Sequence, residues 1–190
     1  MRKIIYFVAC SLDGFIANSD GSHTGFSNHQ EYLNRLFTEF PETLPSHFRE
    51  AMGVTAENRY FDTVLMGRKT YEVGLKDGFT NPYAHLRQYV FSRSLNVSPN
   101  KAVTLVTADA IACIRALKNG IGKDIWLCGG GSLASFLFSA GLIDSLILKV
   151  NPFIMGTGIP LFAPKIPQNS WVLTHNQVYP GDIIMLYYQI

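Results

Sequence analysis

The strongest constraint on the fold is a change of pattern at about residue 145. Before it, short apolar runs typical of buried strands alternate with segments whose apolar residues recur at helical spacing. After it come three strand-like segments with no helix between them, and Pro180-Gly181-Asp182 is a turn signal joining the last two. Strand–helix alternation favours a parallel sheet, and the tail favours antiparallel strands at one edge. The sequence therefore predicts an α/β fold with a mixed, mostly parallel central sheet, antiparallel C-terminal strands and flanking helices.

The individual elements follow from the same patterns. Residues 3–10 (KIIYFVAC) are apolar almost throughout, as expected of a central strand covered on both faces. Apolar residues at helical spacing predict a helix over 28–40, which Pro41 and Pro45 end. Further strands are predicted at 63–66, 89–92, 103–107, 124–128, 145–151, 171–179 and 183–189, and further helices at 68–74, 109–119 and 132–140.

Size and composition limit the class of protein. The 190 residues suit one large domain, so we expect a single domain over residues 1–190. Hydrophobic residues make up 47% and charged residues 16%, a balance that excludes a disordered chain. The net charge of +2 is too small for a general nucleic-acid binder. Cys10, Cys113 and Cys128 form neither a disulfide framework nor a metal-site spacing, and they indicate free thiols in a reducing compartment.

Two segments resemble targeting or membrane sequences. Residues 1–10 place an apolar run of seven after Arg2-Lys3, at the lower limit for a signal peptide, but the run is equally typical of a first strand. Residues 125–143 carry no charge over a length that can span a membrane, yet Gly129-Gly130-Gly131 interrupts them. We interpret this segment as strand, turn and buried helix, and expect a cytoplasmic protein without a membrane span.

The glycine triplet is the clearest chemical signal. Gly129, Gly130 and Gly131 stand between a predicted strand and a predicted helix. Such a turn presents bare backbone N–H groups and the positive end of a helix to an anion. The alternative is a tight packing turn, which needs only one or two glycines.

Two other strand ends are similar. Gly67 is followed by Arg68, Lys69 and Thr70, and Ser92-Arg93 follows a third strand. Arginine can grip a phosphate with two hydrogen bonds, and lysine adds a point charge. The alternative is that these are ordinary surface cations. Because ligands of such sheets bind outside the carboxyl ends of the strands, the three strand ends together indicate a ligand with several phosphates.

Five motifs occur in the order found in a known family. They are SLDGFIA (11–17), VLMGRKTYE (64–72), FSR (91–93), GGGS (129–132) and NPFIMGTGIPLF (151–162). With them the chain resembles the dihydrofolate reductase-like superfamily, and within it the reductase domain of bacterial riboflavin biosynthesis (RibD C-terminal-like) and its stand-alone relatives. The resemblance implies a three-layer fold, an NADPH-dependent oxidoreductase and a homodimer.

The resemblance also assigns residues to the cofactor. It implies that Gly67 and the Arg-Lys-Thr after it meet the NADPH phosphates, and that Ser92 and Arg93 meet the adenosine 2′-phosphate. The glycine triplet would lie against the nicotinamide and the pyrophosphate, and Ile16 and Ala17 would line the nicotinamide pocket. The full implied cofactor set is Ile16, Ala17, Gly67, Arg68, Lys69, Thr70, Ser92, Arg93, Gly129, Gly130, Gly131, Ser132 and Leu133.

The catalytic and substrate residues are less well marked. Asp13 and Glu31 are the candidate catalytic carboxylates; the alternatives are a turn former for Asp13 and a solvated first-turn residue for Glu31. Phe153 and Gly156 are candidates for substrate contact, with a bulged edge loop as the alternative. No tryptophan stands in the first loop, and His23 is interpreted as a loop residue.

The expected reaction is hydride transfer from NADPH to a small heterocycle of ribosylamino-pyrimidine or pteridine type. An enzyme of this kind resembles a 5-amino-6-(5-phosphoribosylamino)uracil reductase. Two alternatives stay open. One is a non-catalytic NADP-binding dimeric module, and the other is a dihydrofolate reductase in the strict sense. The expected partner is a small-molecule substrate, with no nucleic acid and no metal.

Overall fold

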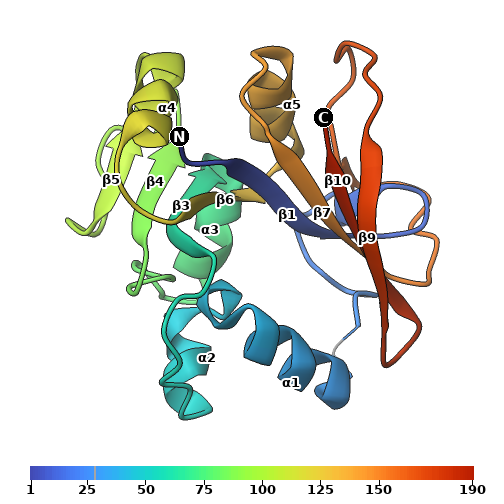
Figure 1. Ribbon diagram of the computed structural model, residues 1–190. Helices are drawn as coiled ribbons and strands as arrows, with labels where there is room; N and C mark the ends of the chain where they lie inside the picture. Colours follow the sequence, from blue (N-terminus) through green and yellow to red (C-terminus); the bar gives the residue numbers. More distant parts are fainter. Residues whose placement is uncertain (28) are drawn as a thin grey trace.

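A computed structural model describes residues 1–27 and 29–190 of the chain (Figure 1). The described residues form an eight-stranded central sheet with the strand order β5-β4-β3-β6-β1-β7-β10-β9. Strands from β5 to β7 run parallel, and β10 is antiparallel to both of its neighbours. The strands are β1 (Ile4–Cys10), β3 (Phe61–Gly67), β4 (Arg87–Phe91), β5 (Val103–Val106), β6 (Asp124–Gly129), β7 (Ser145–Val150), β9 (Val172–Tyr179) and β10 (Ile183–Gln189). The predicted mixed, mostly parallel sheet is confirmed.

Helices cover both faces of this sheet. In Figure 1, α4 and α5 lie above it, and α1 and α3 lie below it. The helices are α1 (Gln30–Glu39), α2 (Ser46–Ala51), α3 (Arg68–Lys76), α4 (Ala110–Asn119) and α5 (Gly131–Ser139), with a short 3₁₀ turn at Pro41–Thr43. The three-layer arrangement expected from the resemblance is therefore confirmed.

The first strand explains why two cores form. β1 lies between β6 and β7, and its alternate side chains point to opposite faces. Phe7 packs into the core between the sheet and helices α1 and α3. Tyr6 packs into the core on the other face, between the sheet and helices α4 and α5. Both side chains are almost fully buried. An apolar run without alternation is what a strand covered on both faces needs.

The C-terminal strands form the predicted hairpin. Ile183 pairs with Tyr179 across a three-residue turn, Pro180-Gly181-Asp182, in which Gly181 and Asp182 have φ of +82° and +59°. Glycine adopts the positive φ at position 181 without steric cost.

Some elements differ from the sequence expectation. The helix predicted from residue 28 begins at Gln30 in the structure, and residue 28 itself lies outside the described residues. The sequence analysis missed α2, which has no buried residue and hence no apolar periodicity. It also missed β2 (Phe15–Ala17) and β8 (Ile159–Pro160), which pair in a separate two-stranded sheet and are too short to show a period. No helix in the described part of the chain is long and apolar enough to cross a membrane.

Candidate functional site

Three strand ends come together at one edge of the sheet. β4, β3 and β6 are parallel neighbours, so Phe91, Gly67 and Gly129 end side by side. α3 begins directly after Gly67, and α5 begins at Gly131. The N-termini of both helices therefore lie at this carboxyl edge, where their free N–H groups and dipoles favour an anion.

The three glycines of the triplet have different physical causes. A side chain at Gly131 would overlap the carbonyl oxygen of Pro160, so close packing of β8 requires this glycine. Gly129 has a φ of +153°, which favours glycine. Gly130 has an ordinary extended conformation, and a Cβ there would meet only the Thr70 hydroxyl at 3.5 Å. The packing of the protein therefore accounts for Gly129 and Gly131, and it leaves an open surface at Gly130.

Cations flank this open surface. Arg68 is half-buried and pairs with Glu72 at 3.1 Å, and Lys69 beside it is exposed. An exposed pair one helical turn apart contributes little, so the guanidinium can exchange Glu72 for a phosphate at small cost. The Thr70 hydroxyl lies beside Gly129 and Gly130. Ser132 is exposed on the first turn of α5, next to half-buried Leu133.

The end of β4 carries a turn held by side-chain hydrogen bonds and an exposed arginine, Arg93. The buried Ser92 hydroxyl accepts the backbone N–H groups of Ser94 at 3.1 Å and Leu95 at 2.8 Å. These bonds shape the turn that carries Arg93. Arg93 is exposed and makes no ion pair within the described part of the chain.

A cavity of about 290 Å³ lies between β1 and α1. Cys128 lines it and directly precedes Gly129, so the cavity adjoins the glycine triplet. Ile16, which the sequence assigned to the nicotinamide pocket, also lines it, whereas Ala17 is buried with its carbonyl oxygen against Gly158. The lining is mostly apolar and aromatic: Phe7, Val8, Ala9, Ile16, His23, Ser27, Tyr32, Leu33, Leu36, Phe37, Thr43, Tyr83, Trp126, Cys128 and Lys149.

One lysine enters this cavity. Lys149 lies on β7 opposite Ala9 of β1, and its Nζ lies 4.6 Å from the centre of the Phe7 ring. Burial lowers the pKa of Lys149 to about 8. Burial also raises the pKa of the Cys128 thiol to about 11. At neutral pH the lysine is therefore largely an ammonium and the neighbouring cysteine is a neutral thiol.

The predicted catalytic carboxylates do not line the cavity. The Asp13 carboxylate accepts the backbone N–H groups of Met155 at 3.0 Å and Gly156 at 2.7 Å, and a bond of 2.6 Å from the Ser11 hydroxyl. The Met155 N–H and the Ser11 hydroxyl lower the pKa of Asp13 to about 2. Asp13 thus holds the loop after β7. Glu31 is exposed in the first turn of α1.

The predicted substrate residues lie in that same loop. The Phe153 ring packs edge-on against Phe26 with 5.2 Å between ring centres. Gly156 has a φ of +78°, and its N–H is the one that Asp13 accepts. Neither residue lines the cavity, so the catalytic and substrate assignments of Asp13, Glu31, Phe153 and Gly156 stay predictions.

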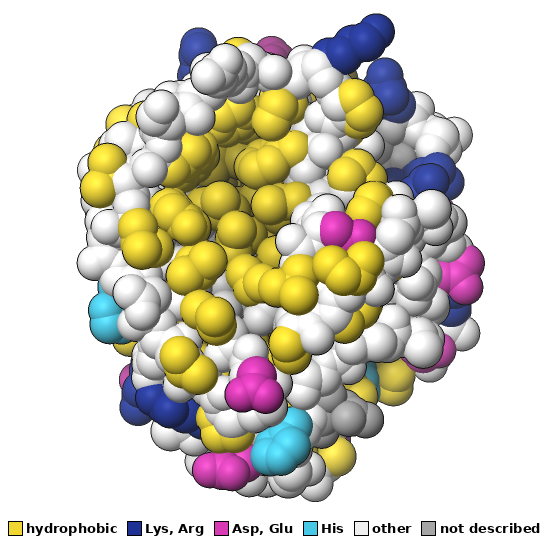
Figure 2. Space-filling model, turned by 90° about the vertical axis from the view of Figure 1, so that its right-hand side faces the viewer, with side chains coloured by type: hydrophobic (Ala, Val, Ile, Leu, Met, Phe, Trp, Pro, Cys, Tyr) yellow, Lys and Arg dark blue, Asp and Glu magenta, His cyan; other side chains and the backbone are white. Residues whose placement is uncertain are grey.

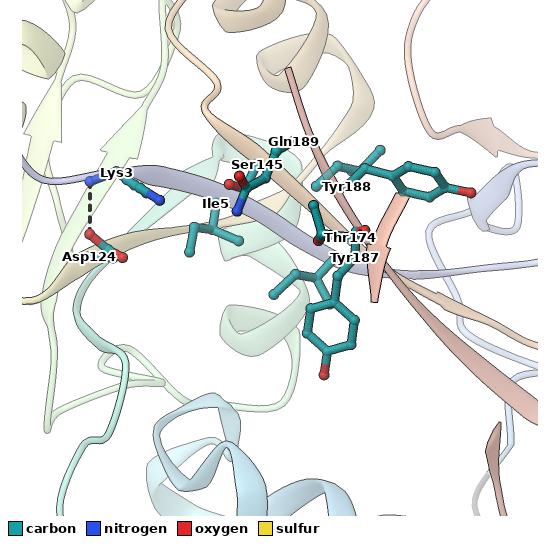
Figure 3. Close-up of a pocket in the computed structure, with 10 residues that line it drawn as sticks. Lys3, Ile5, Asp124, Ser145, Thr174, Tyr187, Tyr188 and Gln189 are labelled. Carbon is teal, nitrogen blue, oxygen red and sulfur yellow. Dashed lines mark hydrogen bonds between the residues drawn. The ribbon is translucent and has the colours of Figure 1, made fainter. Parts of the chain in front are cut away.

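A smaller hollow of about 150 Å³ lies at the opposite edge of the sheet (Figure 3). It is lined by residues at the start of β1, β6 and β7, among them Lys3, Asp124 and Ser145. The Lys3 backbone N–H donates to the Asp124 carboxylate at 2.8 Å. This hollow lies away from the glycine triplet and from the N-termini of α3 and α5.

The sequence analysis missed the principal polar group of the cavity. Lys149 interrupts an otherwise apolar strand, SLILKV, and this single charge was the available signal. His23, interpreted from sequence as a loop residue, lines the cavity as well. Cys128 and Trp126 were assigned only to a buried strand, because sequence alone does not show which face of β6 meets a cavity.

The fold is similar to solved structures of two kinds. A putative riboflavin biosynthesis protein from Shewanella sp. PV-4 aligns over 100% of this chain and 98% of its own, with a TM-score of 0.70 and 23% identity. Dihydrofolate reductase from Enterococcus faecalis, complexed with NADP(H) and RAB-propyl, aligns over 98% of this chain and 95% of its own, with a TM-score of 0.64 and 15% identity. At these identities the similarity shows the shared fold.

A third structure is a diaminohydroxyphosphoribosylaminopyrimidine deaminase/5-amino-6-(5-phosphoribosylamino)uracil reductase from Thermotoga maritima. It matches 99% of this chain and 56% of its own, with a TM-score of 0.63 and 13% identity. Two curated proteins of Bacillus subtilis (strain 168) are similar in sequence. YwjB, described as uncharacterized, is 29% identical over 187 residues, 98% of this chain and 97% of its own. YyaP, also described as uncharacterized, is 27% identical over 198 residues, 98% of this chain and 94% of its own.

The model of one family matches almost the whole chain. It is the RibD C-terminal domain, and it matches residues 2–185. The match spans both helix N-termini, the glycine triplet and the cavity. The chain therefore belongs to the RibD C-terminal domain family.

Proposed function

We propose that the protein is an NADPH-dependent reductase that transfers hydride to a small heterocyclic substrate. The observation that carries this proposal is Gly130. A Cβ at Gly130 would meet only the Thr70 hydroxyl, at 3.5 Å, and Gly130 lies between two helix N-termini and beside an apolar cavity. An open backbone there fits the close approach of a planar, phosphate-bearing cofactor.

Residues of this chain would divide the work of holding NADPH. The first turns of α3 and α5 offer N–H groups to the phosphates, and Arg68 and Lys69 add charge. Arg93, which has no ion pair in the described part of the chain, suits the 2′-phosphate that distinguishes NADPH from NADH. When bound, NADPH supplies the hydride, and the aromatic walls of the cavity exclude water from the reacting ring.

The substrate class follows from the family and the cavity together. A structural neighbour is described as a 5-amino-6-(5-phosphoribosylamino)uracil reductase. The cavity of about 290 Å³ suits a single heterocycle packed between aromatic side chains. We therefore propose a ring of ribosylamino-pyrimidine or pteridine type, as in a riboflavin-biosynthesis reductase. The three free cysteines fit a cytoplasmic, reducing compartment for this reaction.

Thermal melts with NADPH, with NADH and with neither test the cofactor. A ligand at 100 times its Kd adds about 2.7 kcal/mol to the free energy of unfolding. For a chain of this size that raises Tm by roughly 5–10 °C. NADPH is expected to give this shift and NADH a smaller one. The variant R68A/R93A should retain the unliganded Tm and lose most of the NADPH shift.

Arg115→Ala provides a matched control, because Arg115 is exposed in the middle of α4 and lies outside the proposed site. It should keep the full NADPH shift. Equal shifts with NADPH in wild type and in R68A/R93A would contradict the site. No shift with either dinucleotide would leave the glycine triplet as a packing turn.

A non-catalytic NADP-binding module is the second candidate. One observation favours it: within residues 1–27 and 29–190, no carboxylate lines the cavity. The same observation disfavours a strict dihydrofolate reductase. Steady NADPH oxidation with any pteridine, pyrimidine or quinone would exclude the binding module, and failure of methotrexate to bind would exclude the strict dihydrofolate reductase.

We also propose a homodimer, which the resemblance implied. Figure 2 shows a hollowed apolar surface on the side of the molecule that carries β7, β10 and β9. On this side Ile184 and Val178 pair across the hairpin and are 39% and 62% exposed. An apolar patch of this kind on a sheet face suits an interface between copies of the chain.

Sedimentation velocity checks the dimer. Ile184→Lys places a charge on this exposed apolar pair, and Ile121→Lys is the matched control, because Ile121 is 98% exposed in the turn between α4 and β6. We expect wild type and Ile121→Lys to sediment as dimers and Ile184→Lys as a monomer. A monomeric wild type at micromolar concentration would refute the dimer.

A further inference from the structure

The cavity contains a lysine whose ammonium has no hydrogen-bond or ion-pair partner in the described part of the chain. Among the described residues, the Lys149 ammonium makes no hydrogen bond and no ion pair, although its side chain is half-buried. Its Nζ lies over the Phe7 ring, 4.6 Å from the ring centre. A cation over an aromatic face gains only part of the hydration energy that it loses on burial.

Lys118, which is buried, shows what a structural role for a lysine requires. Lys118 is 5% exposed, and its ammonium donates to the Asp144 carboxylate at 2.6 Å and to the Leu142 carbonyl at 3.3 Å. Lys118 is therefore fully partnered within the chain. Lys149 has no such partners in the described part of the protein, and it lines a cavity instead.

The groups that face Lys149 leave its charge uncompensated. Burial raises the pKa of Cys128 on β6, of Tyr32 on α1 and of Tyr83, so all three are neutral at pH 7. Burial, with the lysine charge as a second cause, lowers the pKa of His23, so the imidazole is neutral too.

Charged groups on neighbouring elements are occupied elsewhere. Arg35 and Glu39 of α1 pair with each other at 3.2 Å, and neither lines the cavity. On β10, Met185 pairs with Lys149 in register and Tyr187 donates to the Met185 sulfur at 2.8 Å. Lys149 is thus the one charged lining residue of the described cavity.

We propose that Lys149 determines the specificity of this cavity, and that the cavity binds a planar aromatic ring carrying one negative charge at its edge. A charge held in a partly apolar site is normally paired, and the described residues of this aromatic-walled cavity offer its one ammonium no anion. The aromatic walls select a flat body, and the ammonium selects a ring carboxylate, an enolate or a deprotonated ring nitrogen. The inference rests on the proposed function in taking the cavity as the substrate site.

Three probes of the same shape test this directly: 2-naphthoate, 2-naphthamide and 2-naphthamidine, with charges of −1, 0 and +1. Binding is measured by calorimetry without NADPH at pH 7. Wild type should bind the naphthoate about tenfold to a hundredfold more tightly than the amide, which is the range of a charge-assisted hydrogen bond. The amidine should bind most weakly.

Variants assign the preference to the lysine. Lys149→Met should bind naphthoate and amide equally, and Lys149→Arg should restore part of the anion preference. Lys76→Met, at an exposed position at the end of α3, is the matched control and should behave like wild type. In wild type the preference should decline as pH rises through about 8, the pKa of Lys149. The naphthoate stays ionised over this whole range.

The outcomes separate this inference from the proposed function. An anion preference that persists in Lys149→Met would overturn it, and so would a wild type that binds no naphthoate at millimolar concentration. Naphthoate binding without any NADPH shift in the thermal melts would leave the anion site standing and refute the reductase. An NADPH shift without naphthoate binding would do the reverse.

Discussion

Charged side chains are paired at one end of the parallel strands, and at the other end several have no ion pair among the described residues. We call the end where these strands begin the amino edge of the sheet, and the end where they finish the carboxyl edge. At the amino edge, charged side chains satisfy one another. Arg2 before β1 and Arg87 on β4 both bond the carboxylate of Asp62, and Lys118 pairs with Asp144 before β7. At the carboxyl edge, Lys69, Arg93 and Lys149 have no ion-pair partner within the described residues.

This difference indicates that charges at the amino edge stabilise the fold, whereas charges at the carboxyl edge are available to a ligand. A buried charge without a partner destabilises a fold, because nothing compensates its desolvation. The amino edge therefore stabilises the protein by itself. The carboxyl edge holds cations beside two helix N-termini, an arrangement that costs stability until an anionic ligand arrives. Variants at the two edges should accordingly affect different measurements.

The largest effect on stability is expected at Glu42, a carboxylate in the 3₁₀ turn Pro41–Thr43. It is fully buried and accepts the backbone N–H groups of Tyr60 at 2.6 Å, Phe61 at 2.8 Å and Arg59 at 3.3 Å. Glu42→Ala leaves these donors without an acceptor and should lower the free energy of unfolding by about 3 kcal/mol. Urea unfolding at pH 7 measures this.

Glu42→Gln keeps the side-chain shape and one acceptor oxygen, and it should lose less than half as much. Both variants should retain the wild-type NADPH affinity at a temperature where they are folded. A Glu42→Ala protein as stable as wild type would show that the amino edge does not depend on its internal pairing.

The sequence predicted the sheet far better than the chemistry of the cavity. Strand and helix positions were recoverable because apolar periodicity records burial, and the carboxyl-edge cations were recoverable because they follow strands directly. Lys149 was not, since its importance depends on β7 lying beside β1 in a register that pairs it with Ala9. That pairing joins residues 140 positions apart, and no local pattern encodes it.

The same limit applies to Asp13. Its place after the first strand suggested chemistry, but only the structure shows that its carboxylate accepts N–H groups from Met155 and Gly156. The loop from residue 152 to 158 has no periodic signal of its own. Its packing against the first loop is a tertiary contact that sequence patterns do not report.

Lys118 and Lys149 represent the two edges, and replacing them should change the free energy of unfolding in opposite directions. Lys118→Met leaves Asp144 without its cation, and because Asp144 is partly exposed we expect a loss of about 1–2 kcal/mol. Lys149→Met removes a half-buried charge that has no partner among the described residues, and it should raise the free energy of unfolding by about 1 kcal/mol. Chemical denaturation of both variants at pH 7 provides the measurement.

A pH series checks the cause. The pKa of Lys149 is about 8 in the folded protein, below its unfolded value, so the unfolded state binds more protons between pH 8 and about 10.4. Wild-type stability should therefore gain on that of Lys149→Met as pH rises through this window. A constant difference between the two proteins would contradict the buried ammonium.

Asp13 departs from the contrast between the two edges. It is an acidic group at the carboxyl edge, and its carboxylate already accepts hydrogen bonds from this chain. Its carboxylate is exposed, so Asp13→Asn should change Tm at pH 7 by no more than about 2 °C. The pKa of Asp13 is lowered to about 2 by the Met155 N–H and the Ser11 hydroxyl. Its contribution to stability is therefore present above pH 4 and is lost as pH falls toward 2.

Hydrogen exchange tests directly whether Asp13 holds the loop after β7, which a small change in Tm does not show. The amides of Met155 and Gly156 donate to Asp13, so Asp13→Asn should speed their exchange while the amides of β7 keep wild-type rates. If the carboxylate only positions the loop, reductase activity should fall less than tenfold. A loss of several hundredfold with unchanged exchange at Met155 would instead make Asp13 a catalytic residue, and the carboxyl edge would then hold an acid as well as its cations.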